Sequence, residues 1–299
     1  MQKPNEIREH IAAVEQTRKI TGAMEMISSN RMRQVMGHIE YNRRYFTYIR
    51  RTMKEILISS QDVTHPFLVR RDRRKSRRHS TYVVISGDKG FCGSYNAAVL
   101  NYALDLIGQQ KDFGLITLGH TAESFFRSHG ITPDACLFGI VQDPTLARAR
   151  EVADLLTDLF ENRHTNEICF IYTSFYGETK RRPTHSRLLP VLLPDYDDIR
   201  DVEEMDDILF HPSAQEVFNL MVPQYAVGFI FGVLVQAYAS EHFARMTAMH
   251  SATTNAKEMI DKLNTQYNLV RQSAITNELA EIADAAEILR EENPYGKDY

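Results

Sequence analysis

Apolar residues recur at steps of mostly three and four positions from about Lys3 to Ser59, with no proline after Pro4 in that stretch. They are Ile7, Ile11, Val14, Ile20, Met24, Ile27, Met32, Val35, Ile39, Phe46, Ile49, Met53 and Ile56. This spacing is typical of an amphipathic helix, so we predict one long helix over the segment. The stripe slips between Val14 and Ile20, so the pattern is not a strict heptad.

The middle of the chain, from about Ser80 to Leu209, alternates short apolar runs with helical patterns. Strands are expected at Tyr82–Ile85, Gly114–Leu118, Cys136–Val141 and Ile168–Tyr172, with a further edge strand at Arg187–Leu192 containing Pro190. Helices are expected at Tyr95–Ile107, Thr121–Ser128 and Pro144–Asn162, with Pro144 in the first helical turn. This order predicts an α/β domain with a mostly parallel sheet covered by helices.

The last segment, from Ser213 to about Arg290, has the spacing of a coiled-coil seam. The seam positions are Met246, Met249, Thr253, Ala256, Ile260, Leu263, Tyr267, Val270 and Ala274, followed after a stutter by Leu279, Ile282, Ala286 and Leu289. Pro223 is expected to end or kink a first turn. A helix from Gln224 to Leu289 would then be on the order of 100 Å long at 1.5 Å per residue.

These segments predict an α/β fold combined with a long antiparallel coiled coil. The two terminal helices each have an apolar stripe to bury, and each is the other's nearest partner. We expect them to pair into a rod that flanks the α/β domain. The predicted boundaries are 1–60 for the first helix, 61–79 for a basic linker, 80–209 for the α/β domain, 210–290 for the second helix and 291–299 for a tail.

Composition narrows the class of protein. The chain has 299 residues, 43% of them hydrophobic, and a net charge of -4, which argues against general nucleic-acid binding. No apolar run reaches the roughly 18 residues of a membrane span, and the N-terminus does not resemble a secretory signal. The cysteines Cys92, Cys136 and Cys169 have no zinc-site spacing and fit reduced thiols in a cytosolic protein.

The stretch SGDKGFCGSYN, residues 86–96, follows an apolar run and resembles a phosphate-binding loop. It lacks the G-x-x-x-x-G-K-[ST] pattern, because Cys92 stands five positions after Gly87. It also lacks G-x-G-x-x-G, because Gly87, Gly90 and Gly93 are three apart. We therefore predict no bound nucleotide, no other cofactor and no metal site, and we expect the glycines to permit a tight turn from strand to helix.

Three stretches resemble the γ subunit of F-type ATP synthases. They are EIREHIAAVEQTRKITGAMEMISSNRMR near the N-terminus, SGDKGFCGSYN in the middle, and ASEHFARMTAMHSATTNAKEMI with YNLVRQSAITNELAEI near the C-terminus. The resemblance implies a central-stalk rotor in which a Rossmann-like α/β domain without a cofactor flanks the coiled coil. Its implied partners are the ring of α and β subunits, the ε subunit and the c-ring, with one copy per complex and no catalytic site on this chain.

The resemblance also implies which residues contact the α/β ring. They are Met24, Glu25, Met26, Arg245, Arg271, Gln272, Thr276 and Glu278. In the family, the arginine–glutamine pair hydrogen-bonds a loop of the ring and acts as a catch, and an arginine can grip a carboxylate with two bonds. From spacing alone, Met24 and Met26 would be core residues, and Arg271 would be a solvated surface residue.

Other features depart from the family pattern. Gly22 stands where the family usually has lysine, the tail LREENPYGKDY runs past the usual end of the helix, and its composition favours disorder. Two alternatives remain open at this point: a small-molecule enzyme that uses the α/β domain, and a γ-like scaffold outside the synthase. The family resemblance and the absence of a transit peptide imply a peripheral position at the cytoplasmic face of a bacterial membrane.

The basic run from Arg70 to Arg78 is heavier than the family pattern implies. It contains Arg70, Arg71, Arg73, Arg74, Lys75, Arg77 and Arg78. A solvated loop, an acidic protein partner and membrane headgroups all fit such a run. We place it near the c-ring or ε, so reversal of these charges should weaken the coupling of ion flow to ATP turnover. Unchanged coupling in that variant would contradict this position.

Overall fold

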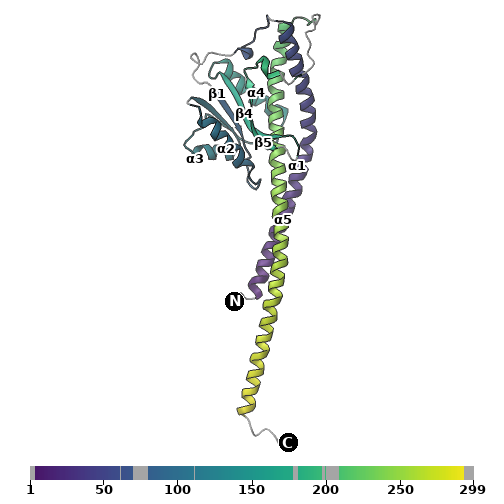
Figure 1. Ribbon diagram of the computed structural model, residues 1–299, viewed down its shortest axis with the longest axis vertical. Helices are drawn as coiled ribbons and strands as arrows, with labels where there is room; N and C mark the ends of the chain where they lie inside the picture. Colours follow the sequence, from purple (N-terminus) through teal and green to yellow (C-terminus); the bar gives the residue numbers. More distant parts are fainter. Residues whose placement is uncertain are drawn as a thin grey trace. The chain divides into compact units, whose positions relative to one another are not determined.

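A computed structural model describes residues 4–60, 62–69, 80–110, 112–177, 181–196, 199 and 209–292 (Figure 1). The long helices are α1 (Pro4–Ser59) and α5 (Ala214–Glu292), of 56 and 79 residues. The strands are β1 (Ser80–Ile85), β2 (Phe113–Leu118), β3 (Ala135–Leu137), β4 (Glu167–Phe175) and β5 (Arg181–Leu189). The shorter helices are α2 (Tyr95–Gly108), α3 (His120–Ser128) and α4 (Leu146–Glu161), with single 3-10 turns at Pro66–Leu68 and Leu193–Tyr196.

The chain divides into two compact units, and both long helices contribute to each of them. The helix unit consists of residues 1–26 and 249–299, and the sheet unit consists of residues 27–248. The prediction that the terminal helices pair is confirmed within each unit.

The pairing is antiparallel in both units. In the helix unit, the Thr253 hydroxyl donates to the Thr21 hydroxyl at 2.8 Å. In the sheet unit, the Asn42 amide donates to the carbonyl of Gly228 at 3.1 Å, and the ring of Phe46 stacks on the ring of Tyr225. Later residues of α1 thus meet earlier residues of α5, as the antiparallel pairing predicts. The stripe predicted on α1 was wrong at Ile20 and Ile27, which are 54% and 55% exposed, whereas Thr21 and Ser28 are buried.

The sheet has the strand order β3-β2-β1-β4-β5. The first four strands are parallel, and β5 pairs antiparallel with β4. The central strand β1 pairs with β2 and β4, so that Val83 lies between Ile116 and Phe170. This topology confirms the mostly parallel sheet. The order of the strands reverses at β1, because β2 and β3 lie on one side of it and β4 and β5 on the other.

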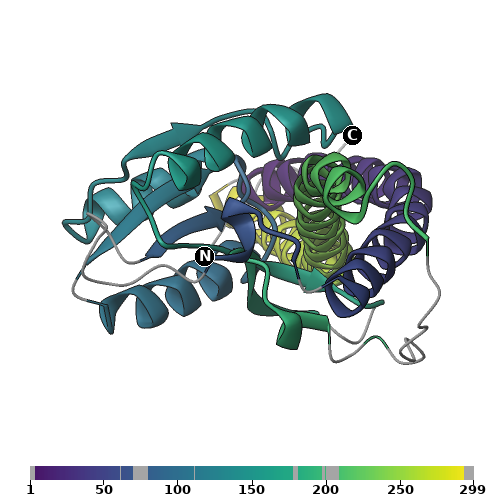
Figure 2. The same ribbon diagram turned by 90° about the horizontal axis from the view of Figure 1, so that it is seen from above.

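Helices cover both faces of the sheet (Figure 2). Alternate residues of β1 face opposite layers, as the strand period of two requires. Tyr82 and Val84 pack with α2 and α3. Val83 and Ile85 pack with α4, α5 and α1. A strand buried on both faces favours a continuous apolar run, which β1 has from Tyr82 to Ile85 after the buried polar residues Ser80 and Thr81.

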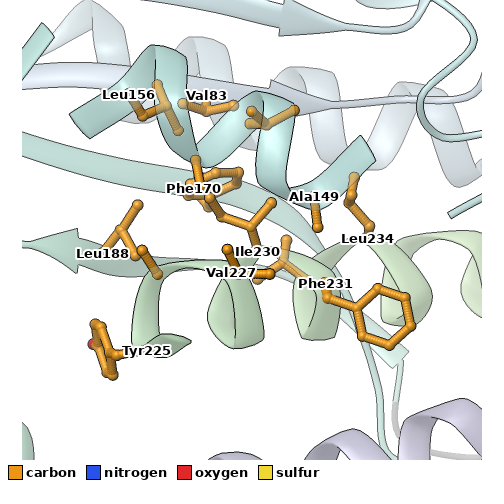
Figure 3. Close-up of a cluster of buried hydrophobic side chains, with 14 of the residues drawn as sticks. Val83, Ala149, Leu156, Phe170, Leu188, Tyr225, Val227, Ile230, Phe231 and Leu234 are labelled. Atoms are coloured by element: carbon orange, nitrogen blue, oxygen red, sulfur yellow. The ribbon is translucent and has the colours of Figure 1, made fainter. Parts of the chain in front are cut away.

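The larger core lies where α5 crosses the sheet (Figure 3). Ile230 and Leu234 of α5 are fully buried and lie toward Phe170 of β4 and Ala149 of α4. A fully buried leucine or isoleucine contributes about 1.5–3 kcal/mol through removal of its side chain from water. The packing of α5 on the sheet is therefore a principal source of stability in this unit.

The apolar stretch of α5 accounts for a further observation. Among the described residues, α5 is the one helix long and apolar enough over 18 residues to cross a membrane, by length and composition alone. More than half of that window is buried inside the protein. Core helices pass the same test, and the contacts of Ile230 and Leu234 are those of a core helix.

Several predicted boundaries were wrong. The strand expected at Cys136–Val141 ends at Leu137, because the chain turns at Gly139, whose φ is +74°. The helix expected from Pro144 begins at Leu146, because the Thr145 side chain caps it by accepting the N–H of Arg148.

The edge strand was predicted in the right place with the wrong extent. β5 begins at Arg181 and ends at Leu189, so Pro190 lies just beyond it. Pro183 lies inside this edge strand, where the absent N–H costs no ladder partner on the open side.

The prediction that Pro223 ends or kinks a first turn was also wrong about the extent of the helix. α5 begins at Ala214 and runs through the proline. Pro223 has no N–H, so the carbonyl of Asn219, four residues earlier, lacks its helical donor. Both residues are exposed. Water can bond to that carbonyl, so burial elsewhere along α5 offsets the cost of the proline. The expected continuous helix from Gln224 to Leu289 is confirmed.

Two of the sequence features, the basic run from Arg70 to Arg78 and the last residues of the tail (293–299), lie outside the described residues. Their proposed roles stay predictions.

Gly119, at the turn from β2 into α3, gives a test of the fold. Its φ is +107°, and an added Cβ would lie 2.4 Å from the carbonyl oxygen of Ser86. We expect Gly119→Ala to lower the free energy of unfolding by about 2–4 kcal/mol. Gly37→Ala is the control, because nothing lies within 4 Å of the added methyl on that helix. It should stabilise the protein by about 0.5–1 kcal/mol. Equal denaturant midpoints for both variants would contradict this account.

Candidate functional site: the exposed helix surface and the loop after β1

The predicted seam of α5 is confirmed through Ala274. The seam residues Met246, Met249, Thr253, Ala256, Ile260, Leu263, Tyr267, Val270 and Ala274 are all at least partly buried. Most of the side chains between them are exposed. Since the partner helix offers Thr21 opposite Thr253, this seam includes a hydroxyl pair as well as apolar contacts.

The first predicted ring-contact cluster lies on α1 in the helix unit. Met24 and Glu25 are half-buried, whereas Met26 is 70% exposed. Glu25 Oε1 accepts from His250 Nδ1 at 2.9 Å across the helix pair. Spacing alone predicted that both methionines are core residues. That prediction holds in part for the half-buried Met24 and is wrong for the exposed Met26. Their contact with a ring of partner subunits stays a prediction.

The second predicted cluster lies near the C-terminal end of α5. Arg271, Gln272, Thr276 and Glu278 are all exposed. Exposed apolar residues alternate with them: Leu269, Ile275, Leu279 and Ile282 are 45–66% exposed. We refer to residues 269–282 of α5 as the distal surface. Such a mixture of apolar and charged side chains is typical of an interface rather than of a solvated helix.

The seam prediction fails at this surface. Leu279 and Ile282 were expected to be buried, but they are 62% and 66% exposed. The antiparallel register places Pro4, where α1 begins, opposite the region of Val270. Within the described residues, α1 therefore has no turn left to cover the later positions of α5.

The loop after β1, residues 86–96, lies at the point where the sheet reverses its strand order. In open α/β sheets this is the usual position of a ligand. The loop is held by its neighbours: the Ser86 hydroxyl accepts from Ala122 N at 2.9 Å. Asp88 accepts from His120 N and from the Gln142 amide, each at 2.8 Å. These bonds connect the loop to the turns after β2 and β3.

Side chains of α5 lie against this loop. Arg245 Nη2 donates to Glu241 Oε1 at 2.6 Å and to the carbonyls of Lys89 and Gly90 at 3.3 and 3.2 Å. An added Cβ on Gly87 would lie 3.0 Å from the Glu241 carboxyl carbon. The ligand position of the fold is therefore occupied in part by the chain's own carboxylate and guanidinium.

This arrangement bears on two predictions. Arg245 was assigned to the ring contact, but its side chain is only 9% exposed and grips the loop. The contact of Arg245 with the ring of α and β subunits therefore stays a prediction. The expected turn is formed partly by Gly93, with a φ of +58°, and partly by Phe91, which adopts a φ of +60° although it is not glycine.

Burial governs the electrostatics here. Desolvation raises the pKa of Glu241, and the adjacent Arg245 opposes that rise. Desolvation, together with the positive charges of Arg245 and Arg31, lowers the pKa of His242 to about 3. The thiol of Cys92 also has a raised pKa because of burial. Burial thus favours the neutral forms of His242 and Cys92, whereas the Glu241 carboxylate pairs with Arg245.

The structural role of Glu241 was missed at the level of the sequence. The signal that could have identified the carboxylate is the i,i+4 spacing of Glu241 and Arg245 within an otherwise apolar stretch. A charged pair at that spacing needs a polar surface opposite it, which only the folded loop reveals.

The family model described as ATP synthase matches residues 3–289 of the chain. The ATP synthase gamma chain of Caldanaerobacter subterraneus subsp. tengcongensis is 36% identical over 288 residues, which cover 93% of this chain and 97% of that protein. The gamma chain of Glaesserella parasuis is 33% identical over 287 residues, covering 94% and 97%.

Solved structures share the fold. The Euglena gracilis mitochondrial ATP synthase, described as OSCP/F1/c-ring in rotational state 3, contains a chain with a TM-score of 0.69 and 16% identity, covering 99% of this chain and 98% of that one. The central stalk/c-ring structure from Tetrahymena thermophila has a TM-score of 0.59 and 21% identity, covering 78% and 99%.

The buried imidazole of His242 predicts how stability depends on pH. An unfolded histidine takes up a proton near pH 6.5, whereas His242 stays neutral in the fold until about pH 3. Between these values the unfolded chain binds more protons, so the free energy of unfolding falls as the pH is lowered. We expect His242→Phe to reduce the fall in melting temperature between pH 6.5 and 4, and His164→Phe, at an exposed site, to leave it unchanged. Parallel pH profiles for wild type and His242→Phe would refute this.

Proposed function

The chain belongs to the ATP synthase γ-chain family, and from that premise we propose how its parts serve the central-stalk rotor that couples ion flow to ATP turnover. The identity to bacterial γ chains over nearly the whole length carries the family assignment. The rotor transmits torque between the membrane c-ring and the catalytic α/β ring, and its other partner is ε. The mixture of apolar and charged side chains on the distal surface is the observation that supports a contact between this part of α5 and the α/β ring.

We propose that the distal surface turns against the α/β ring. Leu269, Ile275 and Leu279 are exposed in the isolated chain, as apolar residues of an interface must be before assembly. Arg271 stands beside them with a free planar fork suited to a carboxylate. Gln272 and Thr276 add hydrogen-bonding groups on the neighbouring stripe of the helix. In this region, where α1 no longer lies alongside, α5 would contact the ring by itself.

We propose further that this chain contains no catalytic site of its own. Support comes from the loop after β1, where the ligand position of the fold is filled by Glu241 and Arg245. ATP binding to the isolated chain, measured by calorimetry, would overturn that proposal. The complex is membrane-associated, and we place this chain at its cytoplasmic face. Protease cleavage of the chain in inverted but not in right-side-out vesicles would support that location.

The pair Arg271 and Gln272 tests the distal surface. Loss of a hydrogen bond to a charged group costs about 1.5–3 kcal/mol, so ATP hydrolysis by the complex reconstituted with cognate α and β subunits should fall by roughly ten- to a hundredfold in Arg271→Ala/Gln272→Ala. The matched control is Arg33→Ala/Gln34→Ala, an exposed pair of the same residue types on α1.

We expect the control variant to hydrolyse ATP at the wild-type rate. We also expect each complex to contain one copy of the chain per three αβ pairs. Equal losses in both double variants would refute a specific role for the distal surface. If the wild-type chain fails to enter the ring, or αβ activity ignores it, the alternative of a γ-like scaffold outside the synthase becomes the better account.

A further inference from the structure

The contacts between α5 and the rest of the sheet unit change in kind along the helix. Between Tyr225 and Val235 the buried side chains of α5 are apolar and belong to one cluster with the sheet and α4 (Figure 3). Between Gln236 and Arg245 the apolar cluster continues through Ala237, Ala239 and Phe243. In this stretch several polar side chains of α5 also bond to backbone groups at the strand ends. The polar contacts span about three turns of the helix.

The first group of polar contacts lies at the end of β4. The Ser240 hydroxyl donates to the carbonyl of Thr173 at 3.1 Å. Gln236 Oε1 accepts from the backbone N–H of Phe175 at 3.4 Å. Ser240 is only 1% exposed, so its bond is made away from water. Both side chains therefore connect α5 to the backbone of β4.

The second group lies at the loop after β1. Arg245 donates to the carbonyls of Lys89 and Gly90 and to Glu241, whose carboxylate lies against Gly87. The side chains of Glu241 and Arg245 are each 9% exposed. We call the side chains of Gln236, Ser240, Glu241 and Arg245, with the backbone groups that they contact, the polar collar.

The two kinds of contact resist different motions. Apolar burial is non-directional, so it opposes separation of α5 from the sheet more than rotation of the helix about its axis. Hydrogen bonds weaken steeply when donor and acceptor lose alignment, so contacts to fixed backbone groups oppose such rotation. A buried ion pair is weak evidence for added stability, since its desolvation cost can exceed its attraction. The collar is therefore better suited to holding orientation than to raising stability.

The position of the collar matches this role. The sheet unit ends at Ala248, only three residues after Arg245. α5 thus passes from the sheet unit into the helix unit directly after the collar. A twist applied to α5 from its helix-unit end reaches Arg245 and Glu241 before it reaches the wholly apolar contacts of Tyr225–Val235.

We propose that the polar collar is the joint that keeps α5 from twisting against the sheet domain when the rotor works under load. This inference rests on the rotor function proposed above. A weakened joint yields when the rotor turns against an ion gradient, so ATP is consumed with less ion transport. Without a gradient there is little load, and hydrolysis continues.

The test uses the complete membrane complex in inverted vesicles. The decisive variant is Gln236→Met/Ser240→Ala, which removes the contacts with β4 and touches no residue assigned to the α/β ring. We expect ion uptake per ATP hydrolysed against a gradient to fall about threefold, and hydrolysis in the presence of an uncoupler to stay within about twofold of wild type.

A second variant, Glu241→Met/Arg245→Met, removes the other half of the collar and keeps the buried volume. Its uptake per ATP should fall in the same way, while its melting temperature stays near or above that of wild type. A lower melting temperature with proportional losses of both activities would show that the pair only stabilises the fold, and would overturn the inference.

The control is Val235→Ala, which removes buried apolar volume next to the collar without removing a polar contact. It should lower the melting temperature and leave uptake per ATP unchanged. The inference is overturned if the collar variants retain wild-type uptake per ATP, or if Val235→Ala lowers that ratio as much as they do. If the wild-type chain is missing from the complex, the proposed rotor function fails instead of the joint.

Discussion

The burial of α5 against the sheet is the interaction on which the rest of the sheet unit depends. Ile230 and Leu234 are fully buried between β4 and α4. A helix with an apolar face of this width cannot remain in water, and the sheet needs a layer over the face that α2 and α3 leave open. The same contact fixes where α1 lies, because α1 packs along α5. It also fixes which side chains of α5 reach the strand ends.

A consequence of this packing is that a ligand-binding topology serves a different purpose. The reversal of strand order beside β1 would hold a phosphate in a dinucleotide-binding enzyme. Here Glu241 lies against Gly87 and Arg245 binds the loop carbonyls. The position at which an enzyme of this topology binds its cofactor is filled here by side chains of α5. That use fits a family whose members act as a mechanical part of an enzyme complex.

The two long helices also show how one sequence pattern serves two purposes along its length. Through Ala274 the seam of α5 has a partner in α1, and its side chains are at least partly covered. After that point the same spacing continues, and Leu279 and Ile282 are exposed. An apolar stripe that is uncovered by the described residues is costly in water, which is the reason we propose that a partner subunit covers it in the assembly.

The sequence by itself determined the elements and their pairing, because periodicity is a local property of the chain. The three- and four-residue steps predicted both long helices and the seam through Ala274, a short apolar run predicted the buried strand at Tyr82–Ile85, and the quoted motifs indicated the family. Tertiary structure alone decided that α5 runs through Pro223, since burial of later turns offsets a local cost. It alone decided that Arg245 binds the loop and that Leu279 is exposed. Those outcomes depend on which residues meet in space, and no spacing along one chain records that.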